Sequence, residues 1–195
     1  MYFKRKAYDK LLEWKKLYSE KYAVLLEGAR RVGKSTIAET FAKNEYRSYI
    51  LIDFSKTTSN ILECFDDIGN LNIFFLRLQA ETGITLYEHE SLIIFDEVQD
   101  CPKVINSMKY FYENAPQYHI ACASSLVGIA LAKPSSFPVG KVNFMQIDPM
   151  TFTEFLLANG DENLAKYLET VNTIEPIPDA FFNPLYEKLT ACGCL

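Results

Sequence analysis

The sequence lacks long hydrophobic runs. None of its 195 residues lie in a stretch that approaches the roughly eighteen consecutive apolar residues of a membrane-spanning helix. The first six residues include three basic ones, and they lead into Tyr8-Asp9-Lys10 rather than into the apolar core of a signal peptide. We therefore expect a cytoplasmic protein with no membrane partner.

Cysteine and histidine are also scarce. The five cysteines, at positions 64, 101, 122, 192 and 194, are odd in number and scattered. This argues against a disulfide framework and for a reducing compartment. Neither histidine, His89 or His119, keeps ligand spacing with a cysteine, and no second pair follows Cys192-Gly193-Cys194. The sequence therefore does not predict a metal site built from protein side chains alone.

The net charge of −5 is unevenly distributed, because residues 1–31 carry a balance of +5 and the rest carries −10. A basic segment with aromatic residues nearby is one pattern of nucleic-acid binding. The alternative, which we favour, is a solvated helix face whose aromatic side chains point to the core. The aromatic residues concerned are Tyr2, Phe3, Tyr8 and Trp14.

The most informative motif is residues 28–35, in which two glycines and Lys-Ser have the spacing of a phosphate-binding loop. An apolar run over 22–26 precedes it, and residues 35–42 have a helical pattern. A loop between strand and helix lets backbone N–H groups and the helix N-terminus bind an anion. We expect Lys34 to reach the β- and γ-phosphates and Ser35 to bind magnesium. The predicted nucleotide-binding residues are Gly28, Ala29, Arg30, Arg31, Val32, Gly33, Lys34, Ser35 and Thr36.

A second motif is the apolar run 92–95 followed by Asp96 and Glu97. Such a run fits a parallel strand that is covered on both faces, and ligands bind at the carboxyl ends of such strands. We expect Asp96 to hold the magnesium ion, usually through water, and Glu97 to polarise the attacking water. The alternative is a pair of acids that only solubilise the strand end.

The rest of the chain predicts an α/β fold, because strands alternate with helices. A capping box at Thr151 and Glu154 opens a short helix that Gly160 closes, and residues 55–70 are polar and broken. The other expected strands cover 49–54, 118–123 and 142–147, and the other helices cover 6–19, 74–83, 102–114, 126–131, 162–170 and 178–190.

Ser124 ends the predicted strand beside the phosphate loop, and two roles for it stay open. Its hydroxyl is placed to sense the γ-phosphate, which makes it a catalytic candidate. It is equally suited to cap the helix expected over 126–131.

With these motifs, the chain resembles a family of prokaryotic AAA-superfamily ATPases, over residues 28–36, 91–99, 135–142 and 148–156. The resemblance implies a P-loop NTPase sandwich of three layers, with a parallel five-stranded sheet of order 5-1-4-3-2 and helices on both faces. It also implies ATP and Mg²⁺ as cofactors. Family members usually continue into a C-terminal domain of uncharacterised function. We therefore expect an ATP-binding domain over 1–160 and a helical segment over 161–195 that leads to a missing domain.

The function implied is magnesium-dependent ATP hydrolysis that drives a switch or a motor. The alternative is a regulatory module that binds ATP with negligible turnover, in association with nucleic acid. Glu97 favours hydrolysis, and the absence of an Asn-Lys-x-Asp segment disfavours a GTPase. The macromolecular partner, for which DNA is one candidate, and the oligomeric state are not determined by the sequence.

Arginine is absent from the whole segment after residue 77. Ring-forming ATPases of this superfamily commonly place an arginine finger before the fifth strand, where this chain has Lys133 and Lys141. Such a finger contributes roughly 10³–10⁵ in turnover, and lysine lacks its planar fork. The sequence therefore predicts slow hydrolysis by this chain alone.

We expect a steady-state ATPase rate well below the usual enzyme median of about 10 per second. The measurement is the rate as a function of protein concentration. A rate at or above that median, independent of concentration and unchanged in Lys133→Ala and Lys141→Ala, contradicts the expectation.

Overall fold

The computed structural model describes residues 5–125, 142–171 and 176–192. The chain divides into two compact units, each with its own hydrophobic core. The sheet unit is Ala7–Asp148, and the helical unit is Pro149–Leu195 together with Met1–Lys6. The expected domain boundary at residue 160 stays a prediction.

The sheet unit is built on five parallel strands in the order β2-β3-β4-β1-β5. This is the predicted order 5-1-4-3-2, counted from the opposite edge, and it confirms the predicted fold class. The strands are β1 (Ala23–Gly28), β2 (Ser48–Asp53), β3 (Ser91–Asp96), β4 (His119–Ser125) and β5 (Val142–Gln146).

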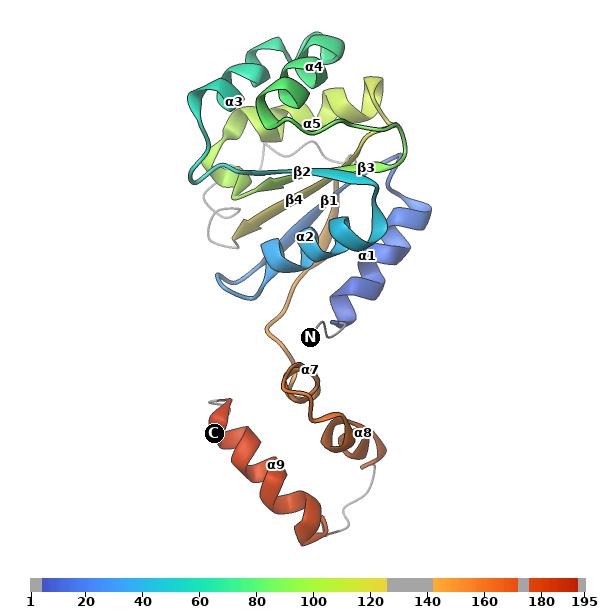
Figure 1. The fold of residues 1–195 in the computed structure, drawn as a ribbon, viewed down its shortest axis with the longest axis vertical. Helices are drawn as coiled ribbons and strands as arrows, with labels where there is room; N and C mark the ends of the chain where they lie inside the picture. Colours follow the sequence, from blue (N-terminus) through green and yellow to red (C-terminus); the bar gives the residue numbers. More distant parts are fainter. Residues whose placement is uncertain (1–4, 126–141, 172–175, 193–195) are drawn as a thin grey trace. The chain divides into compact units, whose positions relative to one another are not determined.

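Helices cover both faces of this sheet. Figure 1 shows α1 (Lys6–Leu17) and α2 (Lys34–Glu45) on one face and α3 (Ser59–Cys64), α4 (Leu71–Thr82) and α5 (Pro102–Asn114) on the other. Leu92 and Ile94 of β3 pack in the α1–α2 core, whereas Ile93 and Phe95 pack in the α3–α5 core. Successive side chains of a strand point to opposite faces, so a strand covered on both sides is apolar throughout.

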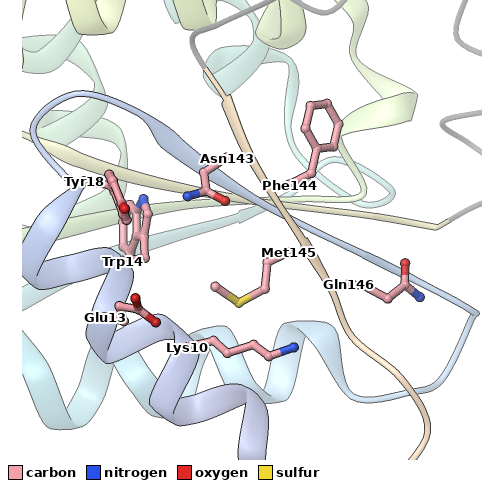
Figure 2. A pocket seen from close by; sticks show the side chains of 8 residues that line it. All are labelled: Lys10, Glu13, Trp14, Tyr18, Asn143, Phe144, Met145 and Gln146. Carbon is pink, nitrogen blue, oxygen red and sulfur yellow. The ribbon is translucent and has the colours of Figure 1, made fainter.

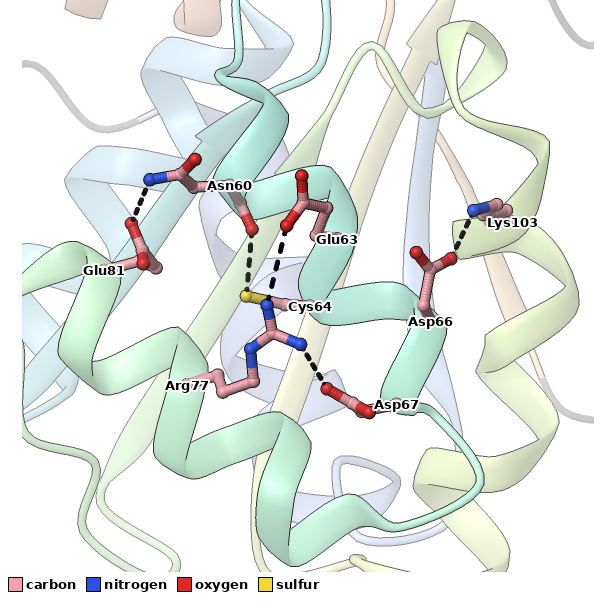
Figure 3. Close-up of polar contacts among 8 residues, drawn as sticks. All are labelled: Asn60, Glu63, Cys64, Asp66, Asp67, Arg77, Glu81 and Lys103. Carbon is pink, nitrogen blue, oxygen red and sulfur yellow. Dashed lines mark hydrogen bonds and ion pairs between the residues drawn. The ribbon is translucent and has the colours of Figure 1, made fainter.

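Residues 55–70 differ from the prediction, because they contain α3 and the 3₁₀ turn η1 (Phe65–Asp67). Phe65 packs against the rings of Phe74 and Phe95, with centroids 5.1 and 5.7 Å away. Polar side chains cover the outside: Arg77 of α4 forms ion pairs with Glu63 and Asp67 (Figure 3). The helix therefore depends on packing against α4 and the sheet, which the local sequence pattern does not reveal.

The helical unit contains α7 (Phe152–Ala158), α8 (Glu162–Thr170) and α9 (Asp179–Ala191). The predicted capping box is confirmed, since the Thr151 hydroxyl accepts from the Glu154 amide at 3.2 Å and the Glu154 carboxylate accepts from the Thr151 amide at 2.8 Å. The helix expected over 126–131 lies outside the described residues.

The aromatic residues of α1 point inward. Tyr8 and Trp14 are 5% and 1% exposed, as the solvated-helix alternative predicts, while Tyr2 and Phe3 lie outside the described residues. A cavity of about 330 Å³ lies between α1 and β5, and Trp14 and Met145 are among its lining residues (Figure 2). Within the described ranges, the helices are too short or too polar to traverse a bilayer.

Candidate nucleotide-binding site

The phosphate loop lies between the end of β1 and the start of α2, as predicted, and its two glycines are required by the backbone. A Cβ added to Gly28 would lie 2.2 Å from the carbonyl oxygen of Ile147, far inside van der Waals contact. Gly33 precedes the first turn of α2 at φ 89°, in the left-handed region that glycine adopts without steric cost. The loop therefore fits tightly against the chain that leaves β5.

Lys34 extends over this loop. Its side chain is only 6% exposed, and Nζ donates to the carbonyl oxygens of Gly28 at 3.1 Å and Ala29 at 2.9 Å. These carbonyls satisfy hydrogen bonds of the ammonium group but do not neutralise its charge. A buried cation at a helix N-terminus is well suited to an anionic ligand.

The side chains of Ser35 and Asp96 lie together, although the two residues are 61 positions apart in the sequence. Asp96 ends β3 and is 6% exposed; its carboxylate accepts hydrogen bonds from the Ser35 side chain and, at 3.0 Å, from the Glu97 amide. Burial raises the pKa of Asp96, and these hydrogen bonds only partly oppose the shift. Because Mg²⁺ prefers oxygen ligands, this hydroxyl and buried carboxylate fit such an ion.

Asp53 contrasts with Asp96, its partner in the register of β2 and β3. Burial acts to raise the pKa of Asp53 as well, but hydrogen bonds from Lys56 and Ser55 outweigh it and lower the pKa. The ammonium of Lys56 lies 2.8 Å from the Asp53 carboxylate. Asp53 therefore already has a cationic partner.

Glu97 directly follows β3 and adopts φ 52° and ψ 46°, a left-handed conformation that is unusual for a residue other than glycine. Its carboxylate accepts a hydrogen bond from the side-chain amide of Gln99. The amide oxygen of Gln99 in turn accepts from the Ser124 hydroxyl at 2.7 Å. Gln99 thus connects Glu97 and Ser124, two of the three predicted catalytic residues, the third being Lys34.

Sequence reasoning missed Gln99, although it ends the segment 91–99 that carries the family resemblance. Ser124 is 1% exposed and lies opposite Glu27 of β1 in the parallel register. Ser124 therefore lies next to the strand that leads into the predicted phosphate loop, which is compatible with the sensor role. The alternative capping role concerns residues outside the described part of the chain, as do Lys133 and Lys141.

The remaining loop residues face outward. Ala29, Arg30, Arg31 and Thr36 are exposed, and Val32 is half-buried against the α1–α2 core. Arg31 has φ 65°. The roles of these residues in nucleotide binding stay predictions.

In a comparison with known families, the family model described as "AAA domain" matches residues 20–156. This range contains the phosphate loop, Asp96, Glu97 and Ser124. No curated protein sequence matches the chain.

Several solved structures align with the chain at low sequence identity. The Aeropyrum pernix ORC1 protein in complex with DNA aligns at TM-score 0.52 and 12% identity, over 82% of this chain and 50% of that chain. C. elegans PCH-2 aligns at TM-score 0.43 and 16% identity, over 89% and 47%. Drosophila ORC bound to DNA aligns at TM-score 0.47 and 11% identity, over 74% and 93%. The chain spans about half the length of PCH-2 and of the Aeropyrum ORC1 protein. At 12% identity, the similarity to the ORC1 protein is a similarity of fold alone.

The contact at Gly28 gives a stability prediction. Gly28→Ala forces the end of β1 away from Ile147, so we expect a loss of about 2 kcal/mol or more in the free energy of unfolding. Gly69→Ala is the matched control, because a Cβ there meets nothing within 4 Å. Its effect should stay within about 1 kcal/mol. Urea denaturation of both variants checks this, and equal effects contradict the close approach at Gly28.

The buried carboxyl of Asp96 gives a pH prediction. An acid whose pKa is raised in the folded state destabilises that state once pH exceeds its unfolded value, about 3.9. Asp96→Asn should therefore raise the free energy of unfolding at pH 7 by about 0.5–2 kcal/mol, in EDTA without nucleotide. The gain should shrink as pH falls through the raised pKa of Asp96 and disappear below about 4, where both states bind the proton.

Asp53→Asn is the control for this prediction. The pKa of Asp53 is lowered, so its substitution should reduce stability at pH 7 instead of raising it. Denaturation curves at a series of pH values measure both variants. A destabilised Asp96→Asn at pH 7 contradicts the assignment.

Proposed function

The chain belongs to the AAA-domain family of P-loop ATPases, and we propose on this premise that it binds Mg·ATP and hydrolyses it to ADP and phosphate. The observation that carries the proposal is the convergence of four groups at the carboxyl ends of β1 and β3. They are the loop-spanning amine of Lys34, the paired oxygens of Ser35 and Asp96, and the carboxylate of Glu97.

Lys34 and the loop amides would bind the phosphates. The ammonium now lies over two loop carbonyls, and a bound β- or γ-phosphate offers it a negative charge that these neutral acceptors lack. Ser35 and Asp96 would hold magnesium, which when bound neutralises charge on the phosphate oxygens. Cation binding also compensates the burial of the Asp96 carboxylate, which supports this assignment.

Glu97 would orient the water that attacks the γ-phosphorus and accept its proton as the bond to the β-phosphate oxygen breaks. In the structure its carboxylate accepts a hydrogen bond from Gln99, which also accepts one from Ser124. We propose that Gln99 is a positioning residue and that Ser124 reports the γ-phosphate through it. A carboxylate accepts several hydrogen bonds, so the bond from Gln99 to one oxygen would orient Glu97 and leave acceptor positions for the water.

The cycle would drive a switch or a motor, and the absence of arginine after residue 77 favours slow turnover without a group from another chain or domain. The second candidate function is a regulatory module that binds ATP with negligible turnover, because the segment after residue 77 offers no arginine to speed hydrolysis. DNA is one candidate partner, because the Aeropyrum ORC1 protein is in complex with DNA and residues 1–31 of this chain are basic.

Lys34→Ala should weaken nucleotide binding with little loss of fold. Mg·ATP at a hundred times its dissociation constant should stabilise the parent protein by about 2.7 kcal/mol. The same ATP concentration should give Lys34→Ala only a small part of this shift. Lys43→Ala, on an exposed part of the same helix and paired with Glu39 at 2.8 Å, should keep all of it. Equal ATP-dependent melting shifts in the two variants would refute the role of Lys34.

Glu97→Gln should bind Mg·ATP as tightly as the parent and lose turnover by about 10²–10⁴-fold, because an amide cannot accept the proton. Calorimetric titration and phosphate release separate the two effects. Asp100→Asn, an exposed acid three positions away, should change neither. If Glu97→Gln hydrolyses ATP at the parent rate, Glu97 is not the base and is only a solvated acid at the end of the strand.

A further inference from the structure

The two histidines of the chain lie together with Glu20, at the amino end of the sheet. Glu20 lies in the turn after α1, His89 in the turn before β3, and His119 begins β4. One ligand atom from each residue lies within 4.8 Å of the other two, and His89 Nδ1 is 3.0 Å from Glu20 Oε1. β4 rises about 3.3 Å per residue, so His119 is about 17 Å from Ser124 at the nucleotide end. The cluster is thus a separate site.

His119 is held in a fixed orientation. It is 4% exposed, and the rings of Tyr46 and Trp14 contact it edge-on with centroids 5.5 and 6.3 Å away. Nδ1 lies 2.9 Å from the Tyr46 hydroxyl, and Nε2 lies 3.3 Å from the Ser19 hydroxyl, beside Glu20. Burial lowers the pKa of His119 to about 4, so the ring is neutral at pH 7, the form that binds metals.

The hydroxyl of Ser19 is a weak partner for Nε2. Ser19 Oγ donates its single proton to the Lys15 carbonyl oxygen at 2.6 Å, so at Nε2 it can only accept. Nε2–H therefore donates to Ser19 Oγ across this long contact, and Nδ1 accepts from the Tyr46 hydroxyl. Zinc at Nε2 would replace that proton, and Nδ1–H would then donate to Tyr46 Oη. A histidine that donates its other ring N–H to an oxygen is the usual arrangement of a metal ligand.

The side chains of His89 and Glu20 are exposed, unlike that of His119, so they can change conformation to reach a metal ion. Their side chains are 57% and 61% exposed, so small rotations can bring the ligand atoms to the spacing that metal bonds of about 2.0–2.2 Å require. The His89 backbone is strained at φ 61°, and its amide donates to the Gln117 carbonyl at 2.7 Å. This bond ties the His89 turn to the segment that enters β4.

We propose that Glu20, His89 and His119 form a zinc site, with water as the remaining ligand. Two imidazoles and one carboxylate suit Zn²⁺ and disfavour Mg²⁺, which selects oxygen ligands. Lys15 adds a positive charge near His119, but its ammonium group pairs with Glu45 at 3.9 Å and packs over the Tyr46 ring. A bound ion would connect the turn after α1, the turn before β3 and the start of β4.

The test is zinc titration of the parent chain against a chromophoric chelator, with excess Mg²⁺ present to occupy oxygen-rich sites. We expect one equivalent of zinc, and Co²⁺ in its place should give the visible absorption of a low-coordinate nitrogen–oxygen site. His89→Ala and Glu20→Gln should each weaken zinc binding more than tenfold, and Tyr46→Phe about tenfold. The first two substitutions are at exposed positions and should leave the fold intact.

Glu90→Gln is the matched control, an exposed acid next to His89 that pairs with Arg47 at 3.2 Å, and it should bind zinc as the parent does. A zinc-dependent rise in melting temperature should appear in the parent and in Glu90→Gln but not in His89→Ala. Less than one equivalent bound at micromolar zinc, or equal affinities in the parent and His89→Ala, would overturn the proposal.

Discussion

The hydrogen bond between Ser35 and Asp96 is the contact on which the candidate nucleotide site depends. It joins the first turn of α2 to the end of β3, two elements that are far apart in the sequence. It also keeps a carboxylate buried at a point where burial disfavours its charge. A bound cation would offset the cost of this burial, so the carboxylate favours a cation at this position. The ammonium group of Lys34, which contacts neutral carbonyls, favours an anion beside it.

The parallel sheet separates two kinds of chemistry. The carboxyl ends of the strands carry Asp96, Glu97 and Ser124, where a phosphate and its magnesium would lie. The amino ends carry His119, which begins the strand that Ser124 helps to end. β4 is buried along its whole length, so it is a rigid connection between the two sites.

Local sequence predicted the parts of the site that local geometry determines. The spacing of Gly28, Gly33 and Lys34 identified the loop, because such a turn needs glycine at fixed positions. The apolar run before Asp96 identified a strand covered on both faces. The strand order required the family resemblance, since periodicity does not say which strands are neighbours.

What the sequence did not reveal depends on contacts between distant segments. α3 is stabilised by Phe65 against α4 and the sheet, and its own polar pattern conceals this. Gln99 acquires a role only because its side chain reaches both Glu97 and Ser124. His89 and His119 are thirty positions apart, and only the pairing of β3 with β4 brings them together.

The central claim is that the loop and the Ser35–Asp96 pair form one Mg·ATP site. A crystal structure of this chain with Mg²⁺ and a non-hydrolysable ATP analogue tests it most directly. The account predicts that Lys34 Nζ leaves the carbonyls of Gly28 and Ala29 for the phosphates, and that Ser35 and Asp96 hold the magnesium ion directly or through water. A nucleotide bound elsewhere, or a magnesium ion without either residue in its coordination or water shell, would contradict the account.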